Sequence, residues 1–244
     1  MNTSLEEARS LAGTIGAAVG AVEDVEVVVC PPFPWLTEVA RLLEGTNIKL
    51  GAQNTHTEAS GAYTGEVSPR MLKGLCTYVL VGQYERRILF SEKDAIVRRK
   101  LQAAQQHGLI PVLCVGETAD QLDEGLGAFV VAEQLEANLE GAQLDERLVI
   151  AYDPPWTTMG LVAPPPLTYV GEIVVHIRET LEMLFSKKIA EQARVIYGGS
   201  VNPRNIVDIV ADARIDGVLA GTASVNADNF SKLVRAFSGA RSLA

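Results

Sequence analysis

The sequence predicts an α/β fold in which helices cover a parallel sheet, and two observations support this prediction. Short runs rich in Val, Ile, Leu and Tyr alternate with longer stretches of helical period along the chain. The strand-like runs are apolar at nearly every position, which is typical of strands buried on both faces. Alternation of this kind indicates successive βαβ units with right-handed crossovers.

Seven strands and seven longer helices are expected. The strand runs cover residues 25–30, 48–51, 77–81, 110–115, 148–152, 194–197 and 217–219. The helical stretches cover about 5–19, then 34–43, 91–107, 129–139, 169–185, 203–212 and 227–237. Thr3 and Glu6 have the spacing of a capping box at the start of the first helix.

The strand count implies an unusual arrangement if the sheet closes into a barrel. A barrel of eight strands would need one strand before the first helix, and Met1 and Asn2 are too few residues to supply it. Seven strands in an open barrel would leave two edges unpaired, which proteins normally cover. We therefore expect either an open seam between the first and last strands or a borrowed strand.

Length and composition limit the domain organisation and the class of protein. The 244 residues are 48% hydrophobic and 21% charged, which suits a single α/β domain over 1–244. The formal charge of −9 argues against nucleic acid and anionic membranes as partners. No apolar run is long enough to cross a membrane, and the first residues do not have the pattern of a signal peptide. Three cysteines without CxxC spacing fit buried thiols in the cytoplasm.

Short polar motifs follow the expected strands, where the functional loops of a parallel α/β barrel lie. In chain order they are Cys-Pro-Pro-Phe at 30–33, Gly-Ala-Gln-Asn at 51–54, Val-Gly-Gln-Tyr-Glu-Arg-Arg at 81–87, Cys-Val-Gly-Glu at 114–117, Ala-Tyr-Asp-Pro-Pro-Trp at 151–156, Tyr-Gly-Gly-Ser-Val at 197–201 and Asp-Gly-Val-Leu-Ala-Gly-Thr-Ala-Ser at 216–224. With these motifs in this order, the chain resembles the triosephosphate isomerase family from end to end.

The resemblance implies a TIM-type (βα)8 barrel that interconverts glyceraldehyde 3-phosphate and dihydroxyacetone phosphate in glycolysis without a cofactor or metal ion. The first strand of that barrel is apparently missing from residues 1–244. The loop from Ser60 to Ser68 resembles the arm through which members of the family form homodimers, so a homodimer is expected.

The catalytic positions depart from the family pattern. The resemblance implies a carboxylate base beside a neutral histidine, under a closing lid. Here the histidine position holds Gln83 and the glutamate position holds Asp153. The lysine of the family's first-strand motif is absent, because Met1 and Asn2 align with the last two letters of that motif. An amide donates hydrogen bonds but does not shuttle protons. The carboxylate of Asp153 is retracted by about 1.5 Å, and a misplacement of about 1 Å can already lower the rate on the order of 10²-fold. We expect strongly impaired isomerase activity.

The phosphate-binding loops are partly retained. Backbone N–H groups in the Gly-Gly-Ser turn can bind an anion, and the last glycine pair of the family reads Gly-Thr here. The candidate phosphate-binding residues are Gly160, Gly199, Ser200, Gly221 and Thr222. In the lid, Met159 replaces a glycine, and prolines at 155 and 164–166 restrict both hinges, so we expect a stiff lid.

Other residues favour structural roles. Glu85, Arg86 and Arg87 are expected to form salt bridges that hold their loop, and Glu117 to tie the barrel rim together. The three histidines are isolated and suggest no metal site. Two alternatives to the isomerase remain open. One is a non-catalytic paralogue that binds phosphate or another small anion, or serves as a scaffold or regulator. The other is an enzyme with different chemistry on the same rim.

Overall fold

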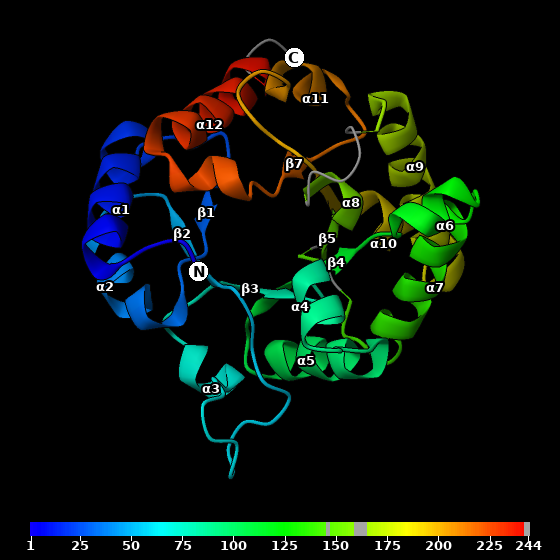
Figure 1. Cartoon of the computed structure of the whole chain (residues 1–244), viewed down its shortest axis with the longest axis horizontal. Helices are drawn as coiled ribbons and strands as arrows, with labels where there is room; N and C mark the ends of the chain where they lie inside the picture. Colours follow the sequence, from blue (N-terminus) through cyan, green and yellow to red (C-terminus); the bar gives the residue numbers. More distant parts are fainter. Residues whose placement is uncertain (145–146, 159–164, 242–244) are drawn as a thin grey trace.

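The chain folds into a curled sheet of seven parallel strands surrounded by helices (Figure 1). The computed structural model describes residues 1–144, 147–158 and 165–241. The strands pair in chain order, and they are β1 (Val28–Val29), β2 (Lys49–Ala52), β3 (Tyr78–Val81), β4 (Ile110–Val115), β5 (Val149–Tyr152), β6 (Arg194–Tyr197) and β7 (Gly217–Val218). The predicted α/β barrel is confirmed, and β1 and β7 are shorter than their apolar runs.

The expected helices are also present. They are α1 (Leu5–Val19), η1 (Phe33–Trp35) with α2 (Leu36–Leu42), α5 (Asp94–Gln106), α7 (Gly127–Leu139), α9 (Leu167–Leu184), α11 (Ile206–Ala211) and α12 (Ala227–Arg241). Short helices that the sequence pattern did not predict lie in the connections, namely α3 (Pro69–Leu72), α4 (Tyr84–Leu89), α6 (Ala119–Asp123), α8 (Pro155–Thr158), α10 (Lys187–Gln192) and η2 (Thr222–Val225). Within the described residues, no helix is long and apolar enough to span a membrane.

The N-terminal cap of α1 lies one residue later than predicted. Ser4, not Thr3, is the N-cap, with an extended backbone at φ −74° and ψ 174°. Its hydroxyl accepts from Glu7 N at 3.3 Å, and Ser4 N donates to the Glu7 carboxylate at 2.7 Å. The Thr3–Glu6 capping box was therefore wrong. Both pairs have the required spacing, and the carbonyl of Thr3 is instead an acceptor for Trp35 Nε1 at 3.1 Å.

Side chains alternate between two cores. One set of strand residues packs with the helices, while the other set fills the barrel interior, as expected for parallel strands covered on both sides. The interior cluster consists of Tyr78, Leu80, Val112, Cys114, Val149 and Ala151. Every residue of β3 and β5 is buried, whereas both residues of β1 and of β7 are partly exposed. The middle of the sheet is therefore better covered than its two ends.

A charged cluster at the amino ends of the strands ties β1 to the opposite wall. Glu26, just before β1, accepts hydrogen bonds from Lys49, Tyr78 and Arg194, the last at 2.7 Å. Burial alone would raise the pKa of Glu26, but these three hydrogen bonds outweigh it and lower the pKa to about 2. The cluster links an outer strand to β3 and β6 across the floor of the barrel.

The Glu26 cluster makes stability depend on acid pH. Because folding lowers the pKa of Glu26 from 4.5 to about 2, its contribution is complete above pH 4.5 and is lost as the pH falls towards 2. Glu26→Gln is expected to lower the free energy of unfolding at pH 7 by about 1–2 kcal/mol, allowing for screening of this partly exposed group. Urea unfolding at several pH values checks this, with Glu23→Gln as an exposed control. A Glu26→Gln difference that persists at pH 2 would contradict the assignment.

Candidate active site at the carboxyl ends of the strands

Most of the predicted site residues lie on one rim of the barrel. Gln83 follows β3 and Asp153 follows β5. Because parallel strands end at the same side of a barrel, the loops after β6 and β7 share this rim with both side chains. Those loops hold the remaining described candidates, Gly199, Ser200, Gly221 and Thr222. Gly160 and Met159 lie outside the described residues, so the expectation of a stiff lid remains a prediction.

Asp153 is held close to two neighbouring strands. Its backbone N donates to Val115 O at 2.8 Å, which extends the β4–β5 ladder by one residue. A Cβ at Gly198 would lie only 2.9 Å from Asp153 Oδ1, so the glycine leaves the space that the carboxyl group occupies. Burial, with a smaller contribution from the negative charge of Glu85, raises the pKa of Asp153 to about 7. The carboxyl group can therefore gain or lose a proton near neutral pH.

Gln83 is oriented by a chain of two amides. Its Nε2 donates to the backbone carbonyl of Gln53 at 2.9 Å, and Gln53 Nε2 donates in turn to Cys30 O at 2.8 Å. One N–H of Gln83 is thus already used, and its buried Oε1 has no hydrogen-bond partner among the described residues. Sequence analysis did not identify Gln53 as a site residue. Its only signal is the position directly after β2.

The Gly-Gly-Ser turn after β6 is shaped by its neighbours. A Cβ at Gly199 would lie 2.1 Å from the hydroxyl of Tyr197, so a larger residue would displace that ring. The carbonyl of Ser200 accepts from Asn205 Nδ2 at 2.7 Å and from Asn202 Nδ2 at 3.3 Å. Steric fit to Tyr197 explains Gly199 without invoking an anion, so phosphate binding by this turn stays a prediction.

The loop after β7 is open to solvent. Gly221 and Thr222 are both exposed, and Thr222 begins η2. The carbonyl of Gly221 accepts from Ser224 N at 2.9 Å and from Ser224 Oγ at 2.6 Å. A Cβ atom built at Gly221 would have no atom of the described residues within 4 Å. The described protein atoms around position 221 therefore do not require a glycine there.

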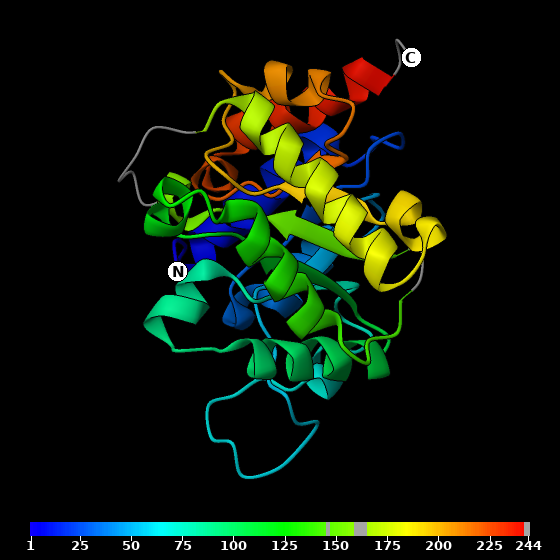
Figure 2. The same ribbon diagram turned by 90° about the vertical axis from the view of Figure 1, so that its right-hand side faces the viewer.

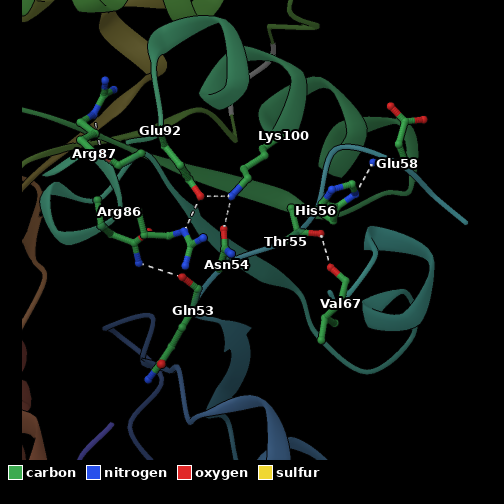
Figure 3. Close-up of polar contacts among 12 residues, drawn as sticks. Gln53, Asn54, Thr55, His56, Glu58, Val67, Arg86, Arg87, Glu92 and Lys100 are labelled. Carbon is green, nitrogen blue, oxygen red and sulfur yellow. Dashed lines mark hydrogen bonds and ion pairs between the residues drawn. The ribbon is translucent and has the colours of Figure 1, made fainter. Parts of the chain in front are cut away.

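Buried ion pairs support the loop that carries Gln83 (Figure 3). Glu92 Oε1 accepts from Arg86 Nε and from Lys100 Nζ, both at 2.5 Å, and Lys100 also donates to Asn54 Oδ1 at 2.8 Å. Arg87 donates to Gly82 O at 2.7 Å and pairs with Asp94 at 2.6 Å. The predicted structural salt bridges are confirmed for Arg86 and Arg87. Among the described residues, Glu85 forms no such ion pair, so its predicted salt bridge was wrong.

Glu117 joins three aromatic side chains under the rim. Its Oε1 accepts from Tyr152 OH at 2.9 Å, Tyr169 OH at 3.2 Å and Trp156 Nε1 at 3.3 Å. Burial raises the pKa of Glu117, although these hydrogen bonds oppose the shift. The expected role of Glu117 in tying the rim together is confirmed.

The loop from Ser60 to Ser68 projects from the body of the molecule (Figure 2). Residues 60–66 are exposed, including Tyr63 at 46%. The base of the loop is ordered by contacts of its own, since His56 N donates to Val67 O at 2.8 Å and the rings of His56 and Tyr63 lie 4.3 Å apart. The loop is thus a defined protrusion.

Within the described residues, neither the cysteines nor the acidic side chains form a second catalytic or metal-binding site. Burial raises the pKa of Cys114 well above its ordinary value, so this thiol beside Asp153 stays protonated. Among the described residues, no group of three or more His, Cys, Asp or Glu side chains could hold a metal ion. Asp153, with a pKa raised to about 7, is an ionisable group of this rim that suits proton transfer at neutral pH.

Comparisons with known proteins agree over nearly the whole chain. The family model described as "Triosephosphate isomerase" matches residues 1–237. A triosephosphate isomerase of Roseiflexus sp. (strain RS-1) is 45% identical over 232 residues, covering 93% of this chain and 91% of the relative. One from Caldanaerobacter subterraneus subsp. tengcongensis is 47% identical over 213 residues, covering 86% and 85%. The crystal structure of the enzyme from Bartonella henselae superposes with a TM-score of 0.87 at 33% identity, covering 97% and 95%.

Proposed function

Because the chain belongs to the triosephosphate isomerase family, we propose that it interconverts glyceraldehyde 3-phosphate and dihydroxyacetone phosphate at a reduced rate. The observation that carries this proposal is the buried carboxyl group of Asp153, with a pKa of about 7, at the end of β5. We take residues 1–244 as one domain that performs the reaction without a cofactor.

In the proposed reaction, Asp153 in its ionised form removes a proton from the carbon next to the substrate carbonyl. The same carboxyl group then returns the proton to the neighbouring carbon, while the hydroxyl proton passes directly between the two adjacent oxygens of the enediolate, so that aldose becomes ketose or the reverse. The second N–H of Gln83 Nε2 donates to the substrate oxygen, because the first is bonded to Gln53 O. Gly160, Gly199, Ser200, Gly221 and Thr222 would hold the phosphate group through backbone N–H groups and hydroxyls.

Three features limit the rate. Asp153 is one methylene shorter than the glutamate of the family pattern, which moves its carboxylate away from the substrate carbon. The amide of Gln83 cannot carry a proton between the two substrate oxygens. The last glycine pair of the family reads Gly221 and Thr222 here, so a β-branched side chain crowds one backbone approach to the phosphate.

A second candidate function is a non-catalytic phosphate or small-anion binder that acts as a scaffold or regulator. The observation that favours it is the engaged amide of Gln83, whose Nε2 donates to Gln53 O and whose Oε1 is buried. Inorganic phosphate binding without turnover in a coupled assay for glyceraldehyde 3-phosphate conversion would favour the binder. Turnover that depends on Asp153 would favour the isomerase.

The pH dependence tests the assigned base. Because Asp153 must be ionised to accept a proton, kcat/KM is expected to rise with pH and to level off above about pH 7. The charge of Glu85 contributes to the raised pKa of Asp153, so Glu85→Gln is expected to move this rise to lower pH. The coupled assay at pH 5–9 gives both profiles. An unchanged midpoint in Glu85→Gln would show that the titrating group is not Asp153.

The proposed enzyme is a cytoplasmic homodimer that contributes to glycolysis. Support for the dimer comes from the projecting loop and from Met71, which is 67% exposed and lines a pocket together with residues of that loop. Leu89 at 72% and Phe90 at 64%, at the end of α4, are further large apolar side chains that are exposed. Large exposed apolar side chains gathered near a protrusion are typical of a protein–protein interface.

A further inference from the structure

Gln134 connects a helix to the loop that follows β4. It lies in α7, which packs against β4 from outside the sheet (Figure 1). Gln134 Oε1 accepts from Gly116 N at 2.9 Å, and Gln134 Nε2 donates to Gly116 O at 3.1 Å. One side-chain amide thus binds both backbone groups of a single residue. Because two parallel hydrogen bonds restrict orientation as well as distance, the pair fixes this point of the loop.

Gly116 lies directly against the backbone of Asp153. A Cβ atom built at Gly116 would lie 2.8 Å from Asp153 O, 2.9 Å from Asp153 C and 3.0 Å from Pro154 Cα. The preceding residue makes a further contact, because Val115 O accepts from Asp153 N at 2.8 Å. The N–H and the C=O of Asp153 therefore both adjoin the segment Val115–Gly116, so a displacement of Gly116 also displaces residue 153.

The other side of Asp153 is bounded by the turn after β6. Gly198 N donates to Tyr152 O at 2.7 Å, and a Cβ built at Gly198 would lie 2.9 Å from both Cβ and Oδ1 of Asp153. The turn therefore limits the side chain of Asp153, while Gly116 limits its backbone. In such close packing, the position of Gly116 determines how deeply the carboxyl group is buried.

α7 is firmly anchored where Gln134 leaves it. Val131 and Leu135, on either side of Gln134 in the helix, are fully buried. One turn further on, the buried Asn138 donates through Nδ2 to Gln134 O at 2.6 Å and to Asp94 Oδ1 at 2.8 Å. The Gln134 side chain thus extends towards Gly116 from a helix that is held by apolar packing and by a link to α5.

We propose that Gln134 is a positioning residue for Asp153: it fixes Gly116, and Gly116 fixes the depth at which the carboxyl group lies in the rim. The inference rests on the proposed function of Asp153 as the base. Gln134 acts through Gly116 and not on the substrate, so its loss is expected to change kcat much more than KM.

Gln105 provides a matched control at the opposite end of the barrel. It lies in α5, where its Nε2 donates to Gln143 O at 2.6 Å and its Oε1 accepts from Gln143 N at 3.0 Å. Both glutamines are partly buried, and each binds both backbone groups of one residue. Gln143 precedes β5, whereas Gly116 follows β4, so the Gln105 pair lies away from the rim. Methionine at either position keeps an unbranched side chain and removes both hydrogen bonds.

The coupled assay compares Gln134→Met with Gln105→Met. Gln134→Met is expected to lower kcat for glyceraldehyde 3-phosphate by about tenfold or more and to change KM by less than about twofold, since a misplacement of about 1 Å can cost on the order of 10²-fold. Gln105→Met is expected to leave both parameters unchanged. Each variant loses two hydrogen bonds, so their melting temperatures are expected to fall by similar amounts. Equal effects of the two variants on kcat would overturn the proposal.

Titration of the Asp153 carboxyl group gives a readout that needs no turnover. ¹³C NMR of protein labelled at the aspartate carboxyl carbons follows this group, and Asp153→Asn assigns its signal. Within the described chain, Glu85 of α4, Cys114 of β4 and Tyr197 of β6 interact with Asp153. Burial raises the pKa of Cys114 well above its ordinary value and that of Tyr197 to about 12, so both stay uncharged near pH 7. Gln134→Met alters none of these three groups.

The midpoint of the Asp153 titration is expected to fall in Gln134→Met. Burial raises the pKa of Asp153 to about 7. A displaced Gly116 admits water to the carboxyl group, so the pKa is expected to fall by about one unit or more towards its ordinary value. Gln105→Met is expected to keep the midpoint of the unsubstituted protein. The same midpoint in both variants would refute the positioning role.

The two readouts separate this inference from the proposed function. No turnover by the unsubstituted protein, together with a lowered midpoint in Gln134→Met, would retire the isomerase but support the positioning role. If Gln134→Met does not fold, Gly116→Ala acts on the same contact with both Gln134 hydrogen bonds in place, because its Cβ displaces the Asp153 carbonyl group 2.8 Å away. A lowered midpoint is expected there too, and an unchanged midpoint in Gly116→Ala would overturn the proposal.

Discussion

Asp153→Asn is expected to lower kcat/KM for glyceraldehyde 3-phosphate by about 10²-fold or more. Asparagine has nearly the same shape as aspartate but does not accept a proton, so the substitution removes the base and little else. This side chain fits tightly against Gly198, since a Cβ built at Gly198 would lie 2.9 Å from Asp153 Oδ1. A substitution that keeps the side-chain volume of residue 153 is therefore preferred. A coupled assay on both proteins from parallel preparations measures the effect.

Asp153→Glu is the matched variant in the opposite direction. It returns the carboxylate by about 1.5 Å towards its family position and is expected to raise kcat by about tenfold or more, since a misplacement of about 1 Å can cost on the order of 10²-fold. A less active Asp153→Glu enzyme would contradict the claim that the short side chain limits the rate. If the unsubstituted protein and Asp153→Asn turn over equally, the isomerase proposal fails and anion binding remains.

Lys100→Met is expected to lower the free energy of unfolding by about 3–5 kcal/mol, because it removes one partner of a buried ion pair. Lys100 is 3% exposed and Glu92 is 7% exposed. Burial lowers the pKa of Lys100, while the charge of Glu92 opposes this shift. Without the ammonium group, Asn54 Oδ1 loses the donor at 2.8 Å and Glu92 keeps only Arg86. Urea unfolding measures the difference.

Arg99→Met, at the residue directly before Lys100 in α5, is the control for Lys100→Met. Arg99 pairs with Glu58 at 2.6 Å, but the two side chains are 54% and 40% exposed. Exposed pairs contribute about 0–1 kcal/mol, so this variant is expected to unfold nearly as the unsubstituted protein does. If both variants lose the same free energy of unfolding, the buried Lys100–Glu92 pair stabilises the fold no more than the exposed Arg99–Glu58 pair does.

The main elements could be predicted because their signals are local. The apolar runs that became β4 and β6 have the same bounds in the sequence pattern and in the structure. The run at 25–30 became only Val28–Val29, since a strand at the end of a sheet has one neighbour and its ladder is short. At the first helix, Thr3–Glu6 and Ser4–Glu7 have equal spacing, so only the backbone conformation distinguishes the two caps.

The position of the candidate residues on the rim could be predicted from the sequence, but their contacts could not. Gln83 and Asp153 were identified from motifs that follow strands, and both lie on the expected rim. The donation from Gln83 to Gln53 O joins loops 30 residues apart and could not be inferred from either motif. The raised pKa of Asp153 depends on its burial and on Glu85, which are properties of the packed rim.

The sequence by itself determined the order of strands and helices, the family to which the chain belongs and the identity of the altered catalytic positions. Hydrophobic period and short motifs carry this information because each spans only a few neighbouring residues. Tertiary structure alone decided that Glu26 meets Arg194, 168 residues away, and that Lys100 is buried with Glu92. Such contacts arise when distant segments pack together, because burial and charge pairing depend on the complete fold.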